Sequence, residues 1–207
     1  MDHYLDQLFL EFPNPNTLGR LLYDGALKFE DRTWLTTKAG PMTYKTADML
    51  ALEIAAFLKE NGHHLKSFLF IDNNCPVESS IVLLGAIKAG ITLVDARVYP
   101  PLVRQNFIDN KQLLVFEDSR FVTPKTEVSY KQAIKQGEKA LFFDIPPVEE
   151  THYAFYFFNK DDVTGLQASP VEHKKVVKQI YSAETGSNLH PYARVVYHWF
   201  NGFEAPL

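Results

Sequence analysis

Residues 67–95 of this 207-residue chain read SFLFIDNNCPVESSIVLLGAIKAGITLVD, and this stretch decides the fold. Its two ends, Ser67–Asp72 and Ile91–Asp95, are short apolar runs of the kind that form buried strands. Between them, Val77–Ala89 is apolar, has the length of a helix, and is followed by Gly90 as a helix stop. The order strand, helix, strand predicts two parallel strands joined by a right-handed crossover.

The same alternation continues on both sides of this unit. Towards the N-terminus, residues 45–61 carry apolar side chains at helical spacing, and Gly40-Pro41 indicates the turn of a small hairpin. We expect helices at 17–28, 45–61, 77–89, 101–110, 130–136 and 173–183, and strands at 67–72, 91–95, 113–117, 141–145, 153–158 and 194–197.

The predicted fold class is therefore α/β, with a mainly parallel sheet built from βαβ units and helices on both faces. The sequence shows no tandem repeat and no low-complexity tract. We expect residues 1–16 to be an N-terminal extension and residues 17–207 to form a single α/β domain.

Composition excludes several classes of protein. The chain is 46% hydrophobic and 14% aromatic, which is typical of a folded domain and not of a disordered one. A net charge of -4 and a pI near 6.0 exclude a dedicated nucleic-acid binder. We expect no membrane span, because no apolar run approaches about 20 residues. The single cysteine, Cys75, permits no internal disulfide, and with no signal peptide we expect a cytoplasmic protein.

The sequence contains no strong catalytic or metal-binding motif. The seven histidines are scattered, and no zinc-type spacing or nucleophile elbow occurs. Cys75 stands at a strand-to-helix turn, where a helix N-terminus lowers the pKa of a thiol. A nucleophile also needs a base and a group that orients it, and the sequence identifies neither. We interpret Cys75 as an ordinary turn residue, and we predict no catalytic residue and no metal site.

One segment has the position of a phosphate loop without its chemistry. Residues 159–166, NKDDVTGL, follow the aromatic strand at 153–158. A phosphate cradle needs glycines, which let backbone N–H groups approach, and a cation that balances the charge. This segment has one glycine, Gly165, and two adjacent carboxylates, Asp161 and Asp162. Taken alone, it predicts a solvated acidic turn.

In order along the chain, several segments resemble the N-terminal part of the adenylate-forming superfamily, which includes acyl-CoA synthetases, luciferases and nonribosomal peptide synthetase adenylation domains. Met42–Lys45 and the helix that ends in FLKENG resemble its Thr-Tyr-x-Glu-Leu … Gly segment. LLGAIKAG at 83–90 resembles a helix end with Lys-Ala-Gly, and Tyr99-Pro100 resembles a conserved turn. The resemblance runs from about Thr17 to the C-terminus. It implies the family's α/β fold and, as activity, ATP-dependent adenylation of a carboxylic acid.

The phosphate loop departs from this family. The family's loop reads Thr-Ser-Gly-Thr-Thr-Gly-x-Pro-Lys-Gly, and Lys160–Ser169 stands at the corresponding place in this sequence. Only Thr164 and Gly165 are retained, and the family's lysine has no counterpart. A carboxylate about 4 Å from a phosphate oxygen costs about 1 kcal/mol in water and about 4 kcal/mol at an effective dielectric near 20. We expect a degenerate loop, formed by Lys160, Asp161, Asp162, Val163, Thr164 and Gly165. No cofactor is expected; ATP and Mg²⁺ would bind only if the loop functions, with an aspartate bridging the metal.

The C-terminal residues carry a second candidate site. In the family, an aromatic-and-histidine segment begins the substrate pocket, and Tyr197–Phe200 resembles it. The family's adenine-binding and ribose-binding segments and its mobile C-terminal domain come later, and none is present in the 207 residues. We expect four residues to line a pocket or an interface: His198, Trp199, Phe200 and Phe203.

Three functional hypotheses follow. The leading one is a truncated or degenerate domain that cannot adenylate alone and is a structural or partner-binding subunit, as a homodimer or with a second protein. The second is the N-terminal fragment, or a complementing subunit, of an acyl- or aminoacyl-adenylating enzyme. The third is a small-molecule module that uses Phe155, Tyr156, Trp199 and Phe200, although packing within the sheet core is the favoured interpretation of these aromatics.

Overall fold

The computed structural model describes residues 17–63, 65, 67–71, 75–94, 113–123, 126–140, 148–161 and 165–182. Four predicted features therefore lie outside the described residues. These are the N-terminal extension, the helix at 101–110, the strand at 141–145 and the strand at 194–197.

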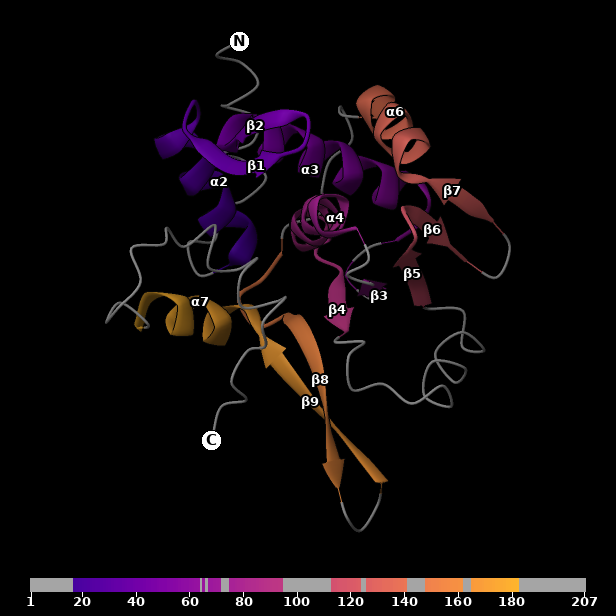
Figure 1. Cartoon of the computed structure of the whole chain (residues 1–207). Coiled ribbons are helices and arrows are strands. Elements are labelled where there is room, and N and C mark those ends of the chain that lie inside the picture. Colours follow the sequence, from indigo (N-terminus) through magenta and orange to yellow (C-terminus); the bar gives the residue numbers. More distant parts are fainter. Residues whose placement is uncertain are drawn as a thin grey trace.

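A seven-stranded sheet in the order β7-β6-β5-β3-β4-β8-β9 forms the centre of the fold (Figure 1). Its central strands, β5-β3-β4-β8, are parallel, and antiparallel strands are added at each side. The predicted α/β class with a mainly parallel central sheet is confirmed. The strands are β3 (Phe68–Ile71), β4 (Thr92–Val94), β5 (Leu113–Glu117), β6 (Arg120–Val122), β7 (Glu127–Ser129), β8 (Tyr153–Asp161) and β9 (Gly165–Glu172).

The βαβ unit predicted from residues 67–95 is present. Helix α4 (Pro76–Lys88) connects β3 to β4, and Phe68 pairs with Thr92 in parallel register. Gly90 ends the crossover with a φ of +70°, a conformation that other residues rarely adopt. A side chain there would also meet Leu65, since a Cβ would lie 2.5 Å from its Cδ2 atom. Both requirements explain why glycine follows this helix.

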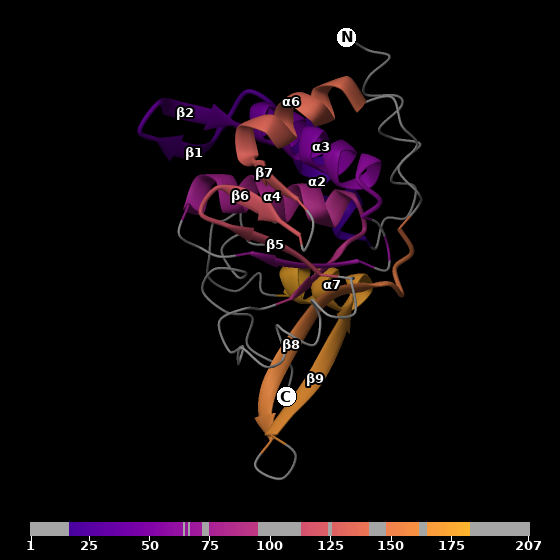
Figure 2. The same cartoon turned by 90° about the vertical axis from the view of Figure 1, so that its right-hand side faces the viewer.

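The remaining helices pack on the two sides of the sheet. In Figure 2, α2, α3, α4 and α6 lie above the sheet and α7 lies below it. Side-chain caps begin two of them: Thr17 Oγ1 accepts from the N–H of Arg20, and Thr43 Oγ1 accepts from the N–H of Thr46. The elements are α2 (Leu18–Phe29), α3 (Tyr44–Glu60), α6 (Tyr130–Ala140) and α7 (His173–Ser182), with a separate hairpin of β1 (Thr33–Thr37) and β2 (Gly40–Thr43).

Helix α6 differs from the sequence prediction at its C-terminal end. It is expected to end at Gln136 but continues to Ala140. Gly137 reads as a helix stop, yet it is needed inside α6, because a Cβ there would collide with the carbonyl oxygen of Glu53 in α3.

Three strands are absent from the sequence prediction. β6 and β7 extend the sheet beyond β5 and have only three residues each, which is too short for a clear pattern. β9 pairs with β8, in the part of the chain where the sequence predicts a loop.

The central strands are buried on both faces. Leu69 and Ile71 of β3 belong to the core that includes the buried residues of α3 and α4. Phe70 points to the opposite face and is paired in register with Val94 and Val115, and all three are buried. Burial on two faces is why these strands read as continuous apolar runs and do not alternate.

An ion pair is buried between α3 and α4. Lys88 Nζ lies 2.6 Å from Asp48 Oδ1, with side-chain exposures of 0% and 8%. Burial raises the pKa of the Asp48 carboxyl, and the Lys88 ammonium acts in the opposite direction. A buried charge without its partner is costly, so each residue makes the other necessary.

We expect Lys88→Met to lower the free energy of unfolding by about 3–5 kcal/mol, because it leaves Asp48 without its buried partner. The double variant Asp48→Leu/Lys88→Met should recover most of this loss. Lys45→Met is the matched control: it breaks a pair with Glu30 whose members are 42% and 46% exposed, and should cost less than about 1 kcal/mol. Urea denaturation measures all three, and equal losses in Lys88→Met and Lys45→Met would contradict the assignment.

A buried histidine joins three elements. His173 begins α7, and its Nδ1 accepts a hydrogen bond from the N–H of Leu18 at the start of α2, 3.3 Å away. Its own backbone N–H donates to the carbonyl of His152, ahead of β8. Burial, with a smaller contribution from His152, lowers the pKa of His173 to about 3. The folded protein therefore holds this imidazole neutral, as an acceptor.

Because His173 is buried in its neutral form, the free energy of unfolding should decrease as the pH is lowered. A histidine whose folded pKa is depressed destabilises the fold as pH drops below its unfolded value near 6.5, because only the unfolded chain takes up the proton. Between about pH 7 and about pH 5, this residue should cost about 2 kcal/mol. The Asn side chain of His173→Asn can still accept a hydrogen bond but cannot titrate. The free energy of unfolding of this variant, measured in urea titrations, should therefore fall by about 2 kcal/mol less than that of the unmodified protein over the same pH interval. Equal losses in the two proteins would refute the prediction.

Candidate functional site

The segment predicted as a phosphate loop is the end of a long hairpin. Strand β8 pairs with β4 at Leu93↔Phe155 and Val94↔Tyr156, and it then continues to Asp161. The hairpin of β8 and β9 consequently projects past the carboxyl end of β4 (Figures 1 and 2). In open α/β sheets, ligands bind at the carboxyl ends of the parallel strands. The hairpin thus emerges at the edge where a ligand site is expected.

Most of the predicted loop is paired strand. Lys160 and Asp161 are the last residues of β8 and pair with Leu166 and Gly165 of β9. The other predicted loop residues, Asp162, Val163 and Thr164, lie outside the described residues. Residues 159–161 therefore belong to strand β8 and not to the predicted acidic turn. Cross-strand pairing outweighs the low strand preference of Lys and Asp here.

This pairing limits what the segment can offer a ligand. In an antiparallel ladder, alternate backbone N–H groups bond to the partner strand and do not remain available. Residues 160–161 and 165–169, which match the family loop in sequence, all lie in this ladder. A phosphate cradle uses several neighbouring N–H groups that converge on one point. An extended hairpin does not converge its donors in this way.

The predicted aromatic cluster is divided by the sheet. Phe155 is fully buried, on the side of the sheet that α3 and α4 cover, and its ring centroid lies 6.0 Å from that of Phe157. Tyr156 points to the other face and contacts Phe68 and Tyr153, at 5.4 and 5.7 Å. Neighbouring residues of a strand face opposite sides, so Phe155 and Tyr156 cannot line one pocket. The sheet-core interpretation is right for Phe155.

The C-terminal candidates cannot be placed. His198, Trp199, Phe200 and Phe203 all lie outside the described residues. Their role in a pocket or interface stays a prediction from the sequence.

Cys75 is part of a turn contact. It precedes α4 at the N-cap position and accepts a hydrogen bond from the Ser119 hydroxyl, with 3.1 Å between Oγ and Sγ. Ser119 belongs to the tight turn between β5 and β6, where its φ is +60°. Among the residues that the structure describes, no group of three metal-ligating side chains occurs. Through its hydrogen bond with Ser119, the Cys75 thiol connects the start of α4 to the β5–β6 turn.

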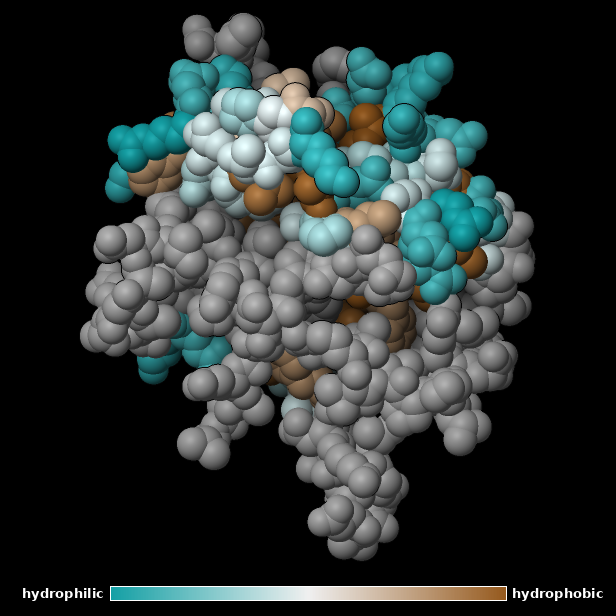
Figure 3. Space-filling model, viewed as in Figure 1, coloured by the Kyte–Doolittle hydropathy of each residue, from teal (hydrophilic) through white to brown (hydrophobic). Residues whose placement is uncertain are grey.

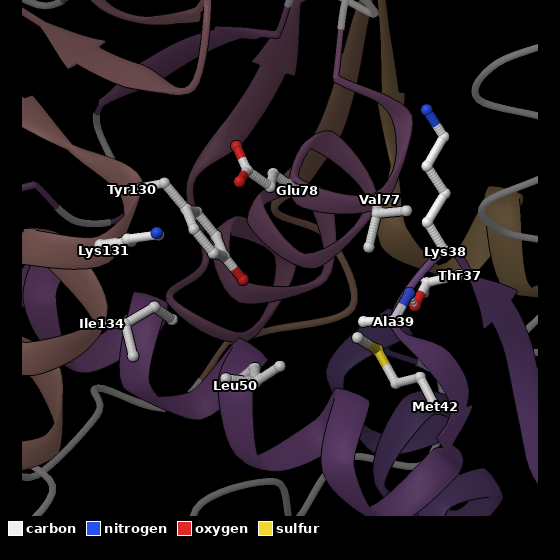
Figure 4. Close-up of a pocket in the computed structure, with 10 residues that line it drawn as sticks. All are labelled: Thr37, Lys38, Ala39, Met42, Leu50, Val77, Glu78, Tyr130, Lys131 and Ile134. Atoms are coloured by element: carbon white, nitrogen blue, oxygen red, sulfur yellow. Dashed lines mark hydrogen bonds between the residues drawn. The ribbon is translucent and has the colours of Figure 1, made fainter.

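An open cleft that the sequence did not reveal lies on the side of the sheet that carries α3, α4 and α6 (Figure 4). It has a volume of about 680 Å³ and is bounded by the β1–β2 hairpin, α3, α4 and α6. Its walls are largely apolar, formed by Met42, Leu50, Val77 and Ile134. These residues come from four separate segments, so no local pattern in the sequence could have grouped them.

Tyr130 places one polar group in this cleft. Its hydroxyl points into the space near Leu50 and Ile134 (Figure 4). Burial raises the pKa of the Tyr130 phenol, and the nearby carboxylates of Glu78 and Glu53 raise it further. The group is therefore a neutral phenol that can donate a hydrogen bond to whatever occupies the cleft.

In the described part of the chain, no helix is both long and apolar enough to cross a membrane. No protein-family model matches the sequence, and no curated protein matches it either.

Solved structures do match the fold. The anthranilate CoA ligase AuaEII in complex with anthranoyl-AMP matches with a TM-score of 0.62 and 15% identity, over 79% of this chain and 35% of that chain. The Klebsiella oxytoca NpsA N-terminal subdomain matches with a TM-score of 0.60 and 14% identity, over 79% and 44%. ATP-bound MatB from Rhodopseudomonas palustris matches with a TM-score of 0.57 and 13% identity, over 78% and 36%.

This chain therefore spans less than half of the length of each of these three proteins. At such low identities the likeness concerns the fold. The βαβ unit, the parallel centre of the sheet and these matches agree, and the chain has the fold of the N-terminal subdomain of adenylate-forming enzymes, as the sequence resemblance implied.

Proposed function

We propose that this chain is a degenerate adenylate-forming N-terminal subdomain that does not adenylate by itself and acts as a structural or partner-binding subunit. One observation carries the proposal: where the family has a glycine-rich loop with a lysine, the sequence here has Asp161 and Asp162, and Asp161 is paired with Gly165 in the β8–β9 hairpin. We further propose that it acts in the cytoplasm.

Electrostatics supports this proposal. Adenylation develops negative charge on phosphate oxygens, and catalysis requires donors or cations placed where that charge develops. Two adjacent carboxylates have the opposite sign, and the ladder from Lys160 to Leu166 uses backbone donors for strand pairing. A triphosphate approaching this hairpin would meet repulsion where the family offers N–H groups.

A second candidate function is the N-terminal fragment, or complementing subunit, of an enzyme that activates an acyl or aminoacyl carboxylate with ATP. The fold match favours it, because the chain aligns with only part of each solved structure and one of these is itself an N-terminal subdomain. The two candidates differ in whether the hairpin contributes to nucleotide binding once a partner is present.

The chain as given should show no ATP–pyrophosphate exchange above background with a panel of aliphatic, aromatic and amino acids. ATP with Mg²⁺ should not raise its melting temperature. A ligand at about a hundred times its dissociation constant adds about 2.7 kcal/mol, which is about 5–10 °C for a domain of this size. Asp161→Ser/Asp162→Gly should not create binding in the 207-residue chain, because we identify no counterpart of the family's adenosine-binding segments among these residues. Exchange, or a clear ATP-dependent shift, would refute the proposal.

The chain should also associate, with itself or with a partner, through its C-terminal aromatic residues. We expect these aromatic side chains to form a surface patch, and exposed apolar patches mark interfaces. Trp199→Glu and Phe203→Glu should therefore each change the mass measured by static light scattering. Tyr153→Glu is the control, because Tyr153 is 44% exposed on β8 and lies outside that segment. A monomer at tens of micromolar, unchanged by both C-terminal substitutions, would contradict self-association.

A further inference from the structure

The apolar cleft adjoins a row of lysines on α6, of which Lys131 lines the cleft itself. Lys131, Lys135 and Lys139 of α6 are exposed and spaced by four residues, so they form one stripe on the solvent face of this helix. None of the three makes an ion pair within the part of the chain that the structure describes. The opposite face of α6, with Ala133 and Gly137, is buried, and Gly137 lies directly against the backbone of α3.

The cleft and the stripe are continuous. Ile134 lines the cleft and stands one helical turn from Lys131, which lines it too. In Figure 4, the Lys131 side chain points towards Tyr130, while Lys38 projects away from Ala39 at the tip of the β1–β2 hairpin. In Figure 3, hydrophobic surface lies between hydrophilic side chains over this part of the molecule. Two lysines, Lys38 and Lys131, and one carboxylate, Glu78, line the cleft. Glu138 is the one acidic residue of α6 against three lysines, so this surface is basic overall although the whole chain has a net charge of -4.

We propose that this surface docks an acidic amphipathic helix of a partner protein, with the large apolar side chains of one helix face in the cleft and its carboxylates along the lysines of α6. Charge complementarity selects an acidic segment, and the apolar walls at Met42, Leu50, Val77 and Ile134 select an apolar anchor. The Tyr130 hydroxyl donates to a backbone carbonyl or side-chain oxygen beside that anchor.

The shape of the surface favours a helix over a membrane. A flat anionic bilayer would satisfy the lysines, but it would leave a recess of about 680 Å³ unfilled behind them. One Leu or Phe side chain would fill only a small part of this volume, whereas the apolar face of a helix supplies several such anchors at helical spacing, as in other helix-in-groove complexes. The inference rests on the proposed partner-binding role and names the chemistry of the partner.

The test uses a fluorescein-labelled peptide of about four helical turns, with Glu on one face and Leu at helical spacing on the other. Fluorescence anisotropy with the full chain should give saturable binding that weakens as salt is raised. Lys131→Glu/Lys135→Glu should weaken it by about tenfold or more. The matched control is Lys175→Glu/Lys178→Glu, which changes the net charge equally on exposed positions of α7, below the sheet.

Further variants distinguish the contribution of the apolar anchors to peptide binding from that of the charges. Ala39→Trp, at an exposed position of the cleft wall, should block the recess and abolish binding while leaving the melting temperature unchanged. A peptide with Lys in place of Glu, and one with Ala in place of Leu, should both fail to bind.

Four outcomes would overturn the inference. They are no binding of the acidic peptide up to about 1 mM, equal binding to the α6 and α7 charge variants, full binding to Ala39→Trp, and stronger binding to vesicles with about 30% phosphatidylserine than to the peptide. A positive exchange assay would refute the proposed lack of adenylation and would leave this docking result intact. The two failures are thus distinguishable.

Discussion

The fold depends on how closely α3 approaches the two helices on either side of it. Gly85 of α4 allows this approach, because a Cβ there would lie 2.6 Å from Ile54 Cγ2 and 2.7 Å from the carbonyl oxygen of Ala51. Gly137 of α6 plays the same part against Glu53. Within the layer that results, Lys88 and Asp48 form their buried ion pair. Close packing excludes water, and this exclusion makes the pair obligatory.

The same helical layer fixes both surfaces of α6. Because Ala133 and Gly137 must face α3, the helix can turn only one way, and its lysines must face solvent. Ile134 lies between these two faces and borders the cleft. The cleft and the basic stripe are thus consequences of how α6 packs, and they lie on the opposite side of the sheet from α7 (Figure 2).

The two candidate sites of this protein belong to different parts of the fold. The β8–β9 hairpin projects from the carboxyl edge of the parallel strands, where ligands bind in open α/β sheets, and Asp161 is the last residue of β8. The cleft lies among α3, α4, α6 and the β1–β2 hairpin, away from β8 and β9. The proposed loss of phosphate chemistry at the first site is compatible with the proposed binding role at the second, because the two share no residue.

The sequence by itself determined the α/β class, the βαβ unit around α4 and the stop at Gly90, because these depend on local periodicity and backbone preference. It also predicts an acidic departure from the family's loop at Asp161 and Asp162, which needs only the order of residues. The tertiary structure alone decided that β8 runs on to Asp161 and that residues from four segments form the cleft. Strand ends and pockets are set by partners distant in the sequence, and a single sequence does not record which distant residues meet.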